Sequence, residues 1–166
     1  MSCIRTYAPE EVSLTVALLY SVQGFSPDTI IRINKDDNYF NTSVGASGGV
    51  ERTHTPSNVY TLEVSLSQTS PSNAILTALA TLDDVSRLAA FPIFAKDSSG
   101  RSLFLATSCW IERPPEVSYS ANHEDRVWEI KCSDMVFNLA GNGEDEELST
   151  DIARLTSIAG QFSRLL

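Results

Sequence analysis

The sequence predicts one mainly β domain, with a barrel-like or sandwich-like sheet, one packed α-helix and a further helix at the C-terminus. Several short segments alternate apolar and polar residues, which is the pattern of strands with one buried face. One segment within residues 1–140 has the apolar spacing of a helix. The chain has 166 residues, which suits one hydrophobic core with appendages.

The clearest predicted strands are residues 12–18 and 60–66, where every second residue is a large apolar one. The hairpin turn Asp-Ser-Ser-Gly at residues 97–100 and the polar turn at residues 121–125 each separate two further strands. The remaining predicted strands are residues 29–33, 91–96, 102–111, 116–120, 126–132 and 135–139.

A helix is predicted at about residues 71–84. Ser70 suits the N-terminal cap and Pro71 suits the first turn. Apolar residues then recur at helical spacing, namely Ile75, Leu76, Leu79 and Leu82. The helix is therefore amphipathic, and we expect it to pack on the sheet.

Residues 34–58 are predicted to form a long loop, because they are rich in Asn, Asp, Ser, Thr and Gly and contain only scattered apolar residues. A loop of about 25 residues exceeds the usual connection length in a compact domain. It is either a mobile surface excursion or an interaction arm that becomes ordered against a partner.

Residues 141–148 are rich in Gly and acidic residues and predict a linker. The segment 149–166 is predicted to be an amphipathic helix capped by Ser149. Its apolar positions are Ile152, Leu155, Ile158, Phe162 and Leu165. Such a helix either folds back on its own barrel or docks on a neighbouring subunit, and the sequence leaves both open.

Charge and reactive residues argue against several classes of function. The formal net charge is −9, whereas affinity for nucleic acid comes mostly from Lys and Arg at the phosphates. His54 and His123 lack partners at metal-ligand spacing, and the glycine cluster at residues 45–49 opens no helix. The cysteines form no C-x-x-C motif, and the sequence predicts no leader and no membrane span. We therefore expect no enzyme, metal, cofactor or membrane partner.

Two stretches carry a resemblance to a known family. Residues 44–53 place a glycine cluster before Glu-Arg-Thr, and residues 62–76 run from a strand into a helix through Ser-Pro-Ser-Asn. In these motifs and in element order, residues 10–140 resemble the tail tube proteins of contractile bacteriophages. Arg52-Thr53-His54 and Ser70-Pro71 are similar to motifs of a relative, the haemolysin-coregulated protein of type VI secretion.

The resemblance implies a structural virion protein with the tail tube fold, whose hexameric rings stack into a conduit for DNA ejection. The implied partners are further copies of the chain, the tail sheath, the baseplate and a tape measure protein in the lumen, with DNA only as transported cargo. Assembly would take place in the host cytoplasm. Contacts between subunits or rings are expected at the long loop, through Gly45, Gly48, Gly49, Glu51, Arg52 and His54.

The negative charge suits a conduit, because an acidic wall does not hold phosphates and lets DNA slide. Side chains expected at the lumen alternate with buried ones on two strands and include no Lys or Arg, namely Ser13, Thr15, Thr61, Glu63 and Ser65. The ordinary solvent-facing side of an antiparallel sheet would have the same residues.

Two other functions also fit the sequence. One is a baseplate tube initiator, or a secretion-system tube protein that carries protein cargo. The other is a small-ligand-binding β-barrel or a hydrolase, which would need a cavity with convergent polar groups.

Overall fold

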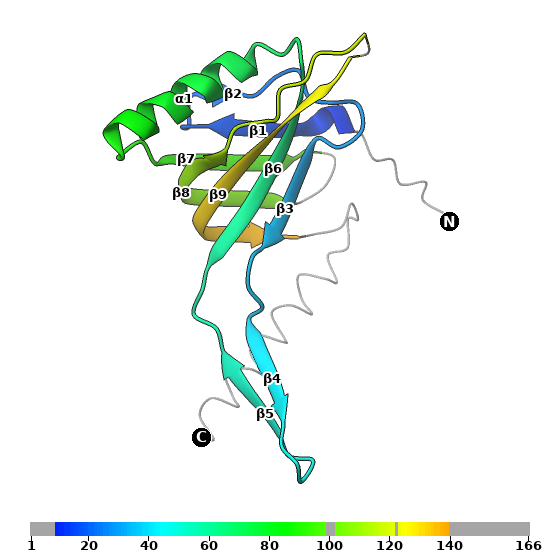
Figure 1. The fold of residues 1–166 in the computed structure, drawn as a ribbon, viewed down its shortest axis with the longest axis vertical. Coiled ribbons are helices and arrows are strands. Elements are labelled where there is room, and N and C mark those ends of the chain that lie inside the picture. The colour runs from blue at the N-terminus through cyan, green and yellow to red at the C-terminus, as the bar shows by residue number, and fades with distance from the viewer. Residues whose placement is uncertain (1–8, 99–101, 122, 140–166) are drawn as a thin grey trace.

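The computed structural model (Figure 1) describes residues 9–98, 102–121 and 123–139, so the predicted linker and C-terminal helix lie outside the described residues. A short 3-10 turn at Pro9–Glu11 precedes the strands and the α-helix. The elements are β1 Val12–Val16, β2 Tyr20–Ser21, β3 Ile31–Lys35, β4 Phe40–Val44, β5 Val50–His54, β6 Val59–Ser67, α1 Ser72–Ser86, β7 Phe91–Asp97, β8 Leu103–Arg113 and β9 Asp125–Asn138. The predicted mainly β fold with a helix packed on the sheet is confirmed.

The main sheet is antiparallel and has 7 strands in the order β2-β1-β7-β8-β9-β6-β3. The long strand β9 joins its two parts, since β9 pairs with β6 over Asp125–Ser133 and with β8 over Glu129–Asn138. In Figure 1, β1, β7 and β8 cross the direction of β3 and β6, so the sheet bends around its buried face. Strands β4 and β5 form a second sheet of 2 strands.

The core consists of side chains on one face of the main sheet together with Val22, which follows β2, and Leu76 of α1. Fully buried aliphatic residues on β1, β6 and β9 include Leu14, Val16, Leu62, Val64, Leu66 and Ile130. Cys109 and Cys132 lie opposite each other on β8 and β9 as fully buried free thiols. A hydrogen bond with Cys109, together with burial, raises the pKa of the Cys132 thiol, which therefore stays protonated at neutral pH.

Helix α1 is attached to the sheet at its N-terminal end. The Trp128 indole Nε1 donates a hydrogen bond of 2.9 Å to Asn73 Oδ1. Asn73 Nδ2 in turn donates to the main-chain oxygens of Ser67, at 3.0 Å, and Ser70, at 3.2 Å. One asparagine therefore connects β9, the end of β6 and the first turn of α1. None of the described helical segments has the length and apolar character that crossing a bilayer requires.

The segment predicted as a long loop, residues 34–58, is largely a β-hairpin. Its first two residues complete β3, and β4 pairs with β5 in a register that places Phe40 opposite His54 and Val44 opposite Val50. The polar composition suggested irregular structure, but the residues that alternate with Asn and Ser are Phe, Thr and Val, which favour strands.

Residues 116–120, predicted as a strand, form none. The guanidinium of buried Arg126 donates to the main-chain oxygens of Glu116, at 3.0 Å, and Ser118, at 3.4 Å. The alternating residues Val117 and Tyr119 are 59% and 83% exposed. The prediction was wrong because an arginine side chain, instead of a neighbouring strand, satisfies this part of the backbone.

Two further strand boundaries differ from expectation. Residues 126–132 and 135–138 belong to one strand, β9, which continues through Asp134 despite its φ of 53° and ends one residue before the predicted end at Leu139. Strand β1 ends at Val16 because Ala17 and Leu18 have φ values of 54° and 58° and turn the chain toward β2.

Candidate functional site

The most prominent feature outside the core is the hairpin Phe40–His54, here called the hairpin arm, which projects from the sheet (Figure 1). Every residue of β4 and β5 is exposed. The tip is closed by hydrogen bonds from Gly45 N to Gly49 O at 2.8 Å and from Gly48 N to Gly45 O at 2.9 Å. An isolated hairpin of two strands is marginally stable in water, so an arm of this kind gains stability by docking.

The two faces of the hairpin arm differ in chemistry. Directly paired residues of an antiparallel ladder share a face. One face therefore carries the large side chains Phe40, Val44, Val50, Arg52 and His54. The Arg52 guanidinium lies 4.3 Å from the Phe40 ring centroid, and the Phe40 and His54 rings meet edge to face at 5.5 Å. The other face carries only small or polar side chains, namely Asn41, Ser43, Glu51 and Thr53.

The structure thus separates the residues predicted to make contacts. Gly45, Gly48 and Gly49 form the tip, Arg52 and His54 share the apolar face, and Glu51 lies on the opposite face. Whether these residues contact another subunit stays a prediction. Sequence reasoning missed Phe40, Val44 and Val50, although their alternation with polar residues around a glycine turn is typical of a hairpin.

The base of the hairpin arm is held to the main sheet by a charged cluster. Lys131 Nζ, on β9, lies 2.7 Å from both Asp36 Oδ2 and Thr61 Oγ1, and Thr61 Oγ1 donates to Asp36 Oδ1 at 2.5 Å. Hydrogen bonds from Lys131 and Thr61 lower the pKa of Asp36, and the bond to Asp36 raises the pKa of Lys131. Both groups therefore stay charged at neutral pH, and the arm leaves the sheet at a defined position.

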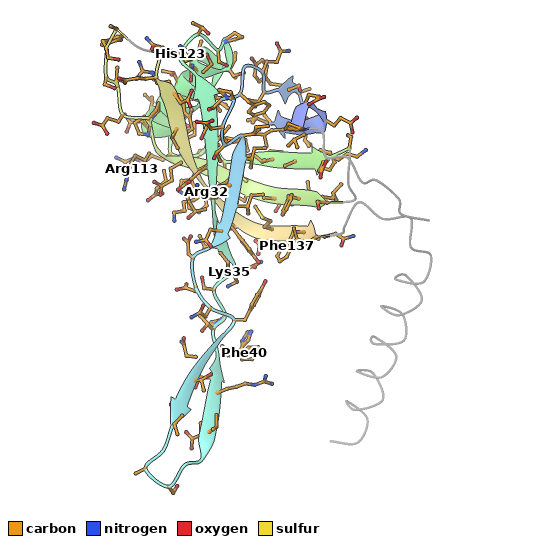
Figure 2. The ribbon with its side chains drawn as sticks, turned by 90° about the vertical axis from the view of Figure 1, so that its right-hand side faces the viewer. Arg32, Lys35, Phe40, Arg113, His123 and Phe137 are labelled. Carbon is orange, nitrogen blue, oxygen red and sulfur yellow. The ribbon has the colours of Figure 1, made fainter. Side chains whose placement is uncertain are left out.

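Aromatic and main-chain contacts reinforce this base. Lys35 Nζ donates to Ser57 O at 2.7 Å and lies 4.7 Å from the Tyr39 ring centroid. The Tyr39 and Tyr60 hydroxyls are 3.1 Å apart. Burial, followed by this hydrogen bond, raises the pKa of Tyr60 to about 12, so the phenol stays neutral. Lys35, Phe40 and the sheet side chains Arg32 and Phe137 are labelled in Figure 2.

The substitution Asp36→Asn is expected to loosen the arm without unfolding the domain. Because the pKa of Asp36 is lowered in the folded chain, its stabilising effect is present above the unfolded pKa and is lost as pH falls through the folded pKa. Hydrogen exchange of the β4 and β5 amides should therefore accelerate in the variant at pH 7, and in the wild type only in acid. The matched control is Asp37→Asn; equal acceleration in both variants would contradict the role of Asp36.

The residues expected at a lumen lie on β1 and β6, on the strand faces opposite the core. Three of the five have a cationic neighbour: Ser13 is paired with Lys96, Thr61 contacts Lys131, and Glu63 forms an ion pair of 3.1 Å with Arg32. Thr15 is paired with Phe94, and Ser65 is buried at 8% exposure. None of the five residues is itself a cation, although the surface around three of them carries cations, and Ser65 contributes little to that surface. Whether these residues face a lumen stays a prediction.

Across β3, β6, β9 and β8, this face carries four charged residues in one row: Arg32, Glu63, Glu129 and Arg113. Arg113 and Glu129 are 3.7 Å apart. Each arginine at the end of the row is thus next to a glutamate, and the row has no net charge. We call this row the charge ladder; both of its arginines are labelled in Figure 2.

The described residues contain no group of three or more His, Cys, Asp or Glu side chains placed to hold a metal ion. His54 lies on the arm, and His123 Nε2 is 3.0 Å from Ser67 Oγ. A cavity of about 750 Å³ opens between β3, the β7–β8 hairpin and the end of β9. Its walls are largely apolar, with Ile31, Ile33, Tyr60, Phe104 and Phe137 among the lining residues.

Comparisons with known proteins agree with the resemblance seen in the sequence. The chain is 30% identical over 153 residues to "Structural protein ORF10" of Pseudomonas phage KPP10, and the match covers 88% of each chain. No protein-family model matches.

Two solved structures share the fold. The tube-terminating cap of the anti-feeding prophage has a TM-score of 0.58 at 9% identity, over 84% of this chain and 95% of that one. The sheath/tube terminator of the PVC extracellular contractile injection system has a TM-score of 0.57 at 8% identity, over 83% and 100%. The predicted tail-tube-related fold agrees with the fold that the chain shares with these two tube-terminating proteins, and the chain belongs to the family of the phage structural protein ORF10.

Proposed function

We propose that the chain is a structural subunit of a phage tail, which assembles into hexameric rings that stack along a tail tube and conduct DNA during ejection. The main support for this proposal is the hairpin arm. It is a fully exposed hairpin with one apolar face, held rigidly at its base in a chain related to a phage structural protein. Such an arm is built to reach a second molecule.

Ring formation is also favoured by the open edges of the main sheet. Strands β2 and β3 lie at its two ends, so each has one edge unpaired within the sheet. Unpaired edges invite uncontrolled association, and pairing them with identical neighbours in a closed ring removes that hazard. Arms projecting from each ring would then join it to the next ring.

The charge distribution suits DNA as cargo instead of ligand. DNA-binding surfaces offer unpaired Lys and Arg to the phosphates. In the charge ladder, Arg32 and Arg113 are each beside a glutamate, and the whole chain has a net charge of −9. A channel lined by this face would present neutralised cations within a negative field, which disfavours tight phosphate binding. The proposed partners of such a tube are the sheath, the baseplate and a tape measure protein.

Deleting residues 45–50, the tip of the hairpin arm, is expected to leave rings but abolish their stacking. Negative-stain electron microscopy of purified wild-type protein should show stacked rings with a central pore, and the deletion should show single rings. Long tubes from the deletion variant would contradict the role of the arm. A wild-type protein that stays monomeric at high concentration would contradict ring formation itself.

A second candidate function is a ring that ends the tube. The fold shared with two tube-terminating proteins favours it. The same microscopy separates the two functions, since a terminator forms single rings as the wild type and shortens tubes grown from other subunits, whereas a tube subunit elongates.

A further inference from the structure

The cavity beside β3 is an opening in the hydrophobic core. Its volume is about 750 Å³, and its walls come from both halves of the bent sheet, with Val12 on β1 and Ile31 and Ile33 on β3. Ile31, Ile33 and Phe104 are partly buried and pack against the core, so the walls continue the core to the surface. Phe137 lines the same opening and is 38% exposed. Protein interiors contain few voids larger than a water molecule, so an apolar opening of this size favours an occupant.

Three polar side chains of the wall already have partners within the chain. Lys35 Nζ donates to the main-chain oxygens of Asp37, at 3.0 Å, and Ser57, at 2.7 Å. The hydroxyls of Tyr39 and Tyr60 are 3.1 Å apart and bond to each other. A site for a small polar ligand would instead direct such groups at the ligand. The wall therefore favours an apolar occupant.

The chain leaves the described part of the structure at this cavity. Leu139, the last residue described, lines the cavity and is 69% exposed. Residues 140–148 follow it and span up to about 30 Å when extended, at roughly 3.3 Å per residue. This length allows the segment 149–166 to return to the cavity beside which the chain emerges. A short tether also gives the segment a high effective concentration at its own cavity.

The segment 149–166 has the apolar pattern that the cavity requires. In the helix that the sequence predicts, its five apolar positions fall within an arc of about 140°, at about 100° per residue. Asp151 is the one charged residue in this arc and belongs to the first turn, where an acidic residue favours the helix. Ser157 falls on the other side of the helix. We call the five apolar residues the C-terminal stripe: Ile152, Leu155, Ile158, Phe162 and Leu165.

We propose that the C-terminal stripe docks in the cavity of its own chain and completes the hydrophobic core of the subunit. Cavities of about 300–1,000 Å³ enclose drug-sized molecules, so this one has room for several side chains of a docked helix. Burying these side chains against Ile33, Phe104 and Phe137 removes apolar surface from water on both partners. The inference concerns one subunit and does not depend on ring formation.

Hydrogen exchange of the full chain, measured by mass spectrometry, tests the contact from both sides. Phe162→Asp in the stripe and Phe137→Asp in the cavity should each accelerate exchange of the amides of residues 152–165 at least tenfold, because each places a carboxylate in an apolar contact. Ser157→Asp and Val136→Asp are the matched controls and should exchange as the wild type does. Val136 is 67% exposed, and as a strand neighbour of Phe137 it lies on the opposite face of β9.

Three results of this experiment would overturn the inference. The amides of residues 152–165 could exchange as fast in the wild type as in Phe162→Asp, which would show that the segment is not docked. Phe162→Asp could accelerate exchange while Phe137→Asp does not, which would place the segment at another surface. Native mass spectrometry of the wild type could show a bound small molecule, which would make a ligand the occupant.

Cross-linking with isotope mixing tests whether the occupant comes from the same chain. Thr29 and Ser102 line opposite walls of the cavity, before β3 and before β8. Each is replaced by Cys together with Gln161→Cys, in a Cys3→Ser background in which the two cysteines of the sheet are buried. A short thiol cross-linker is applied after equal amounts of ¹⁵N-labelled and unlabelled chains have been unfolded together and refolded. Cross-linked peptides should be fully labelled or fully unlabelled.

Peptides that join a labelled chain to an unlabelled one would show that the stripe docks on a neighbouring copy, and the inference would be overturned. Absence of a cross-link from both walls would overturn it as well. In either case the test of stacking by the hairpin arm is unaffected, because it relies on other residues.

Discussion

Replacing Trp128 with alanine should lower the free energy of unfolding by about 3–5 kcal/mol, the usual cost of removing a buried tryptophan. Trp128 is 2% exposed, and its indole nitrogen is bonded to Asn73, the residue that connects β9, β6 and α1. The substitution creates a cavity and also leaves the Asn73 oxygen without its donor. Denaturant unfolding followed by circular dichroism measures the change.

The chain contains a matched control, because its second tryptophan lies at the surface side of the sheet. Trp110 Nε1 donates to Glu112 Oε2 at 2.8 Å in an exposed contact. Trp110→Phe should therefore change the free energy of unfolding by about 0.5 kcal/mol or less. Trp128→Phe, which keeps most of the apolar volume, should fall between the two. Equal losses at the two tryptophans would show that Trp128 does not anchor the helix.

Replacing Gly24 with alanine should lower the free energy of unfolding by about 3 kcal/mol, from a strained backbone and overpacking together. Gly24 has a φ of 71°, and a Cβ added there would lie 2.8 Å from Ser70 Cβ and 2.9 Å from Ser70 Oγ. Ser70 cannot move aside easily, since its hydroxyl donates to Gln23 O and accepts from Ser72 N. The same denaturant unfolding measures the loss.

The substitution Gly48→Ala separates the effect of backbone strain from the effect of overpacking. Gly48 has a similar φ of 83°, but a Cβ added there meets nothing within 4 Å. Its substitution therefore carries the backbone strain without the clash and should cost about 1–2 kcal/mol at most. If Gly24→Ala and Gly48→Ala cost the same, the close approach of Gly24 to Ser70 is not limiting for stability.

Sequence patterns predicted the core well, because a strand or helix with one buried face has apolar residues at regular spacing in the sequence. The alternation at residues 60–66 became β6, whose residues Leu62, Val64 and Leu66 are fully buried. The helix expected at residues 71–84 is observed at Ser72–Ser86. In both cases local preference and tertiary burial agree.

The hairpin arm was harder to predict, because it buries nothing within its own chain. A strand pair exposed on both faces has no strict apolar pattern, and the Asn and Ser residues of β4 made the segment look irregular. The contact residues Arg52 and His54 were proposed from the resemblance, but the apolar partners around them were found only from the pairing of Phe40 with His54 and Val44 with Val50. The strand predicted at residues 116–120 was wrong for a different reason. Its residues alternate as in a strand, but its backbone accepts a hydrogen bond from Arg126 instead of pairing with another strand.

The charged cluster at the base of the arm also determines how accurately the tip of the arm is positioned. From Asp36 to Ser47 the extended chain reaches about 35 Å, at roughly 3.3 Å per residue. An angular error of about 5° at the base displaces a tip at that reach by about 3 Å, the length of one hydrogen bond. The three contacts among Asp36, Thr61 and Lys131 therefore determine the position of a tip about 35 Å away. In an assembly of identical subunits, the accuracy of the contact made by the tip would depend on these three hydrogen bonds at the base.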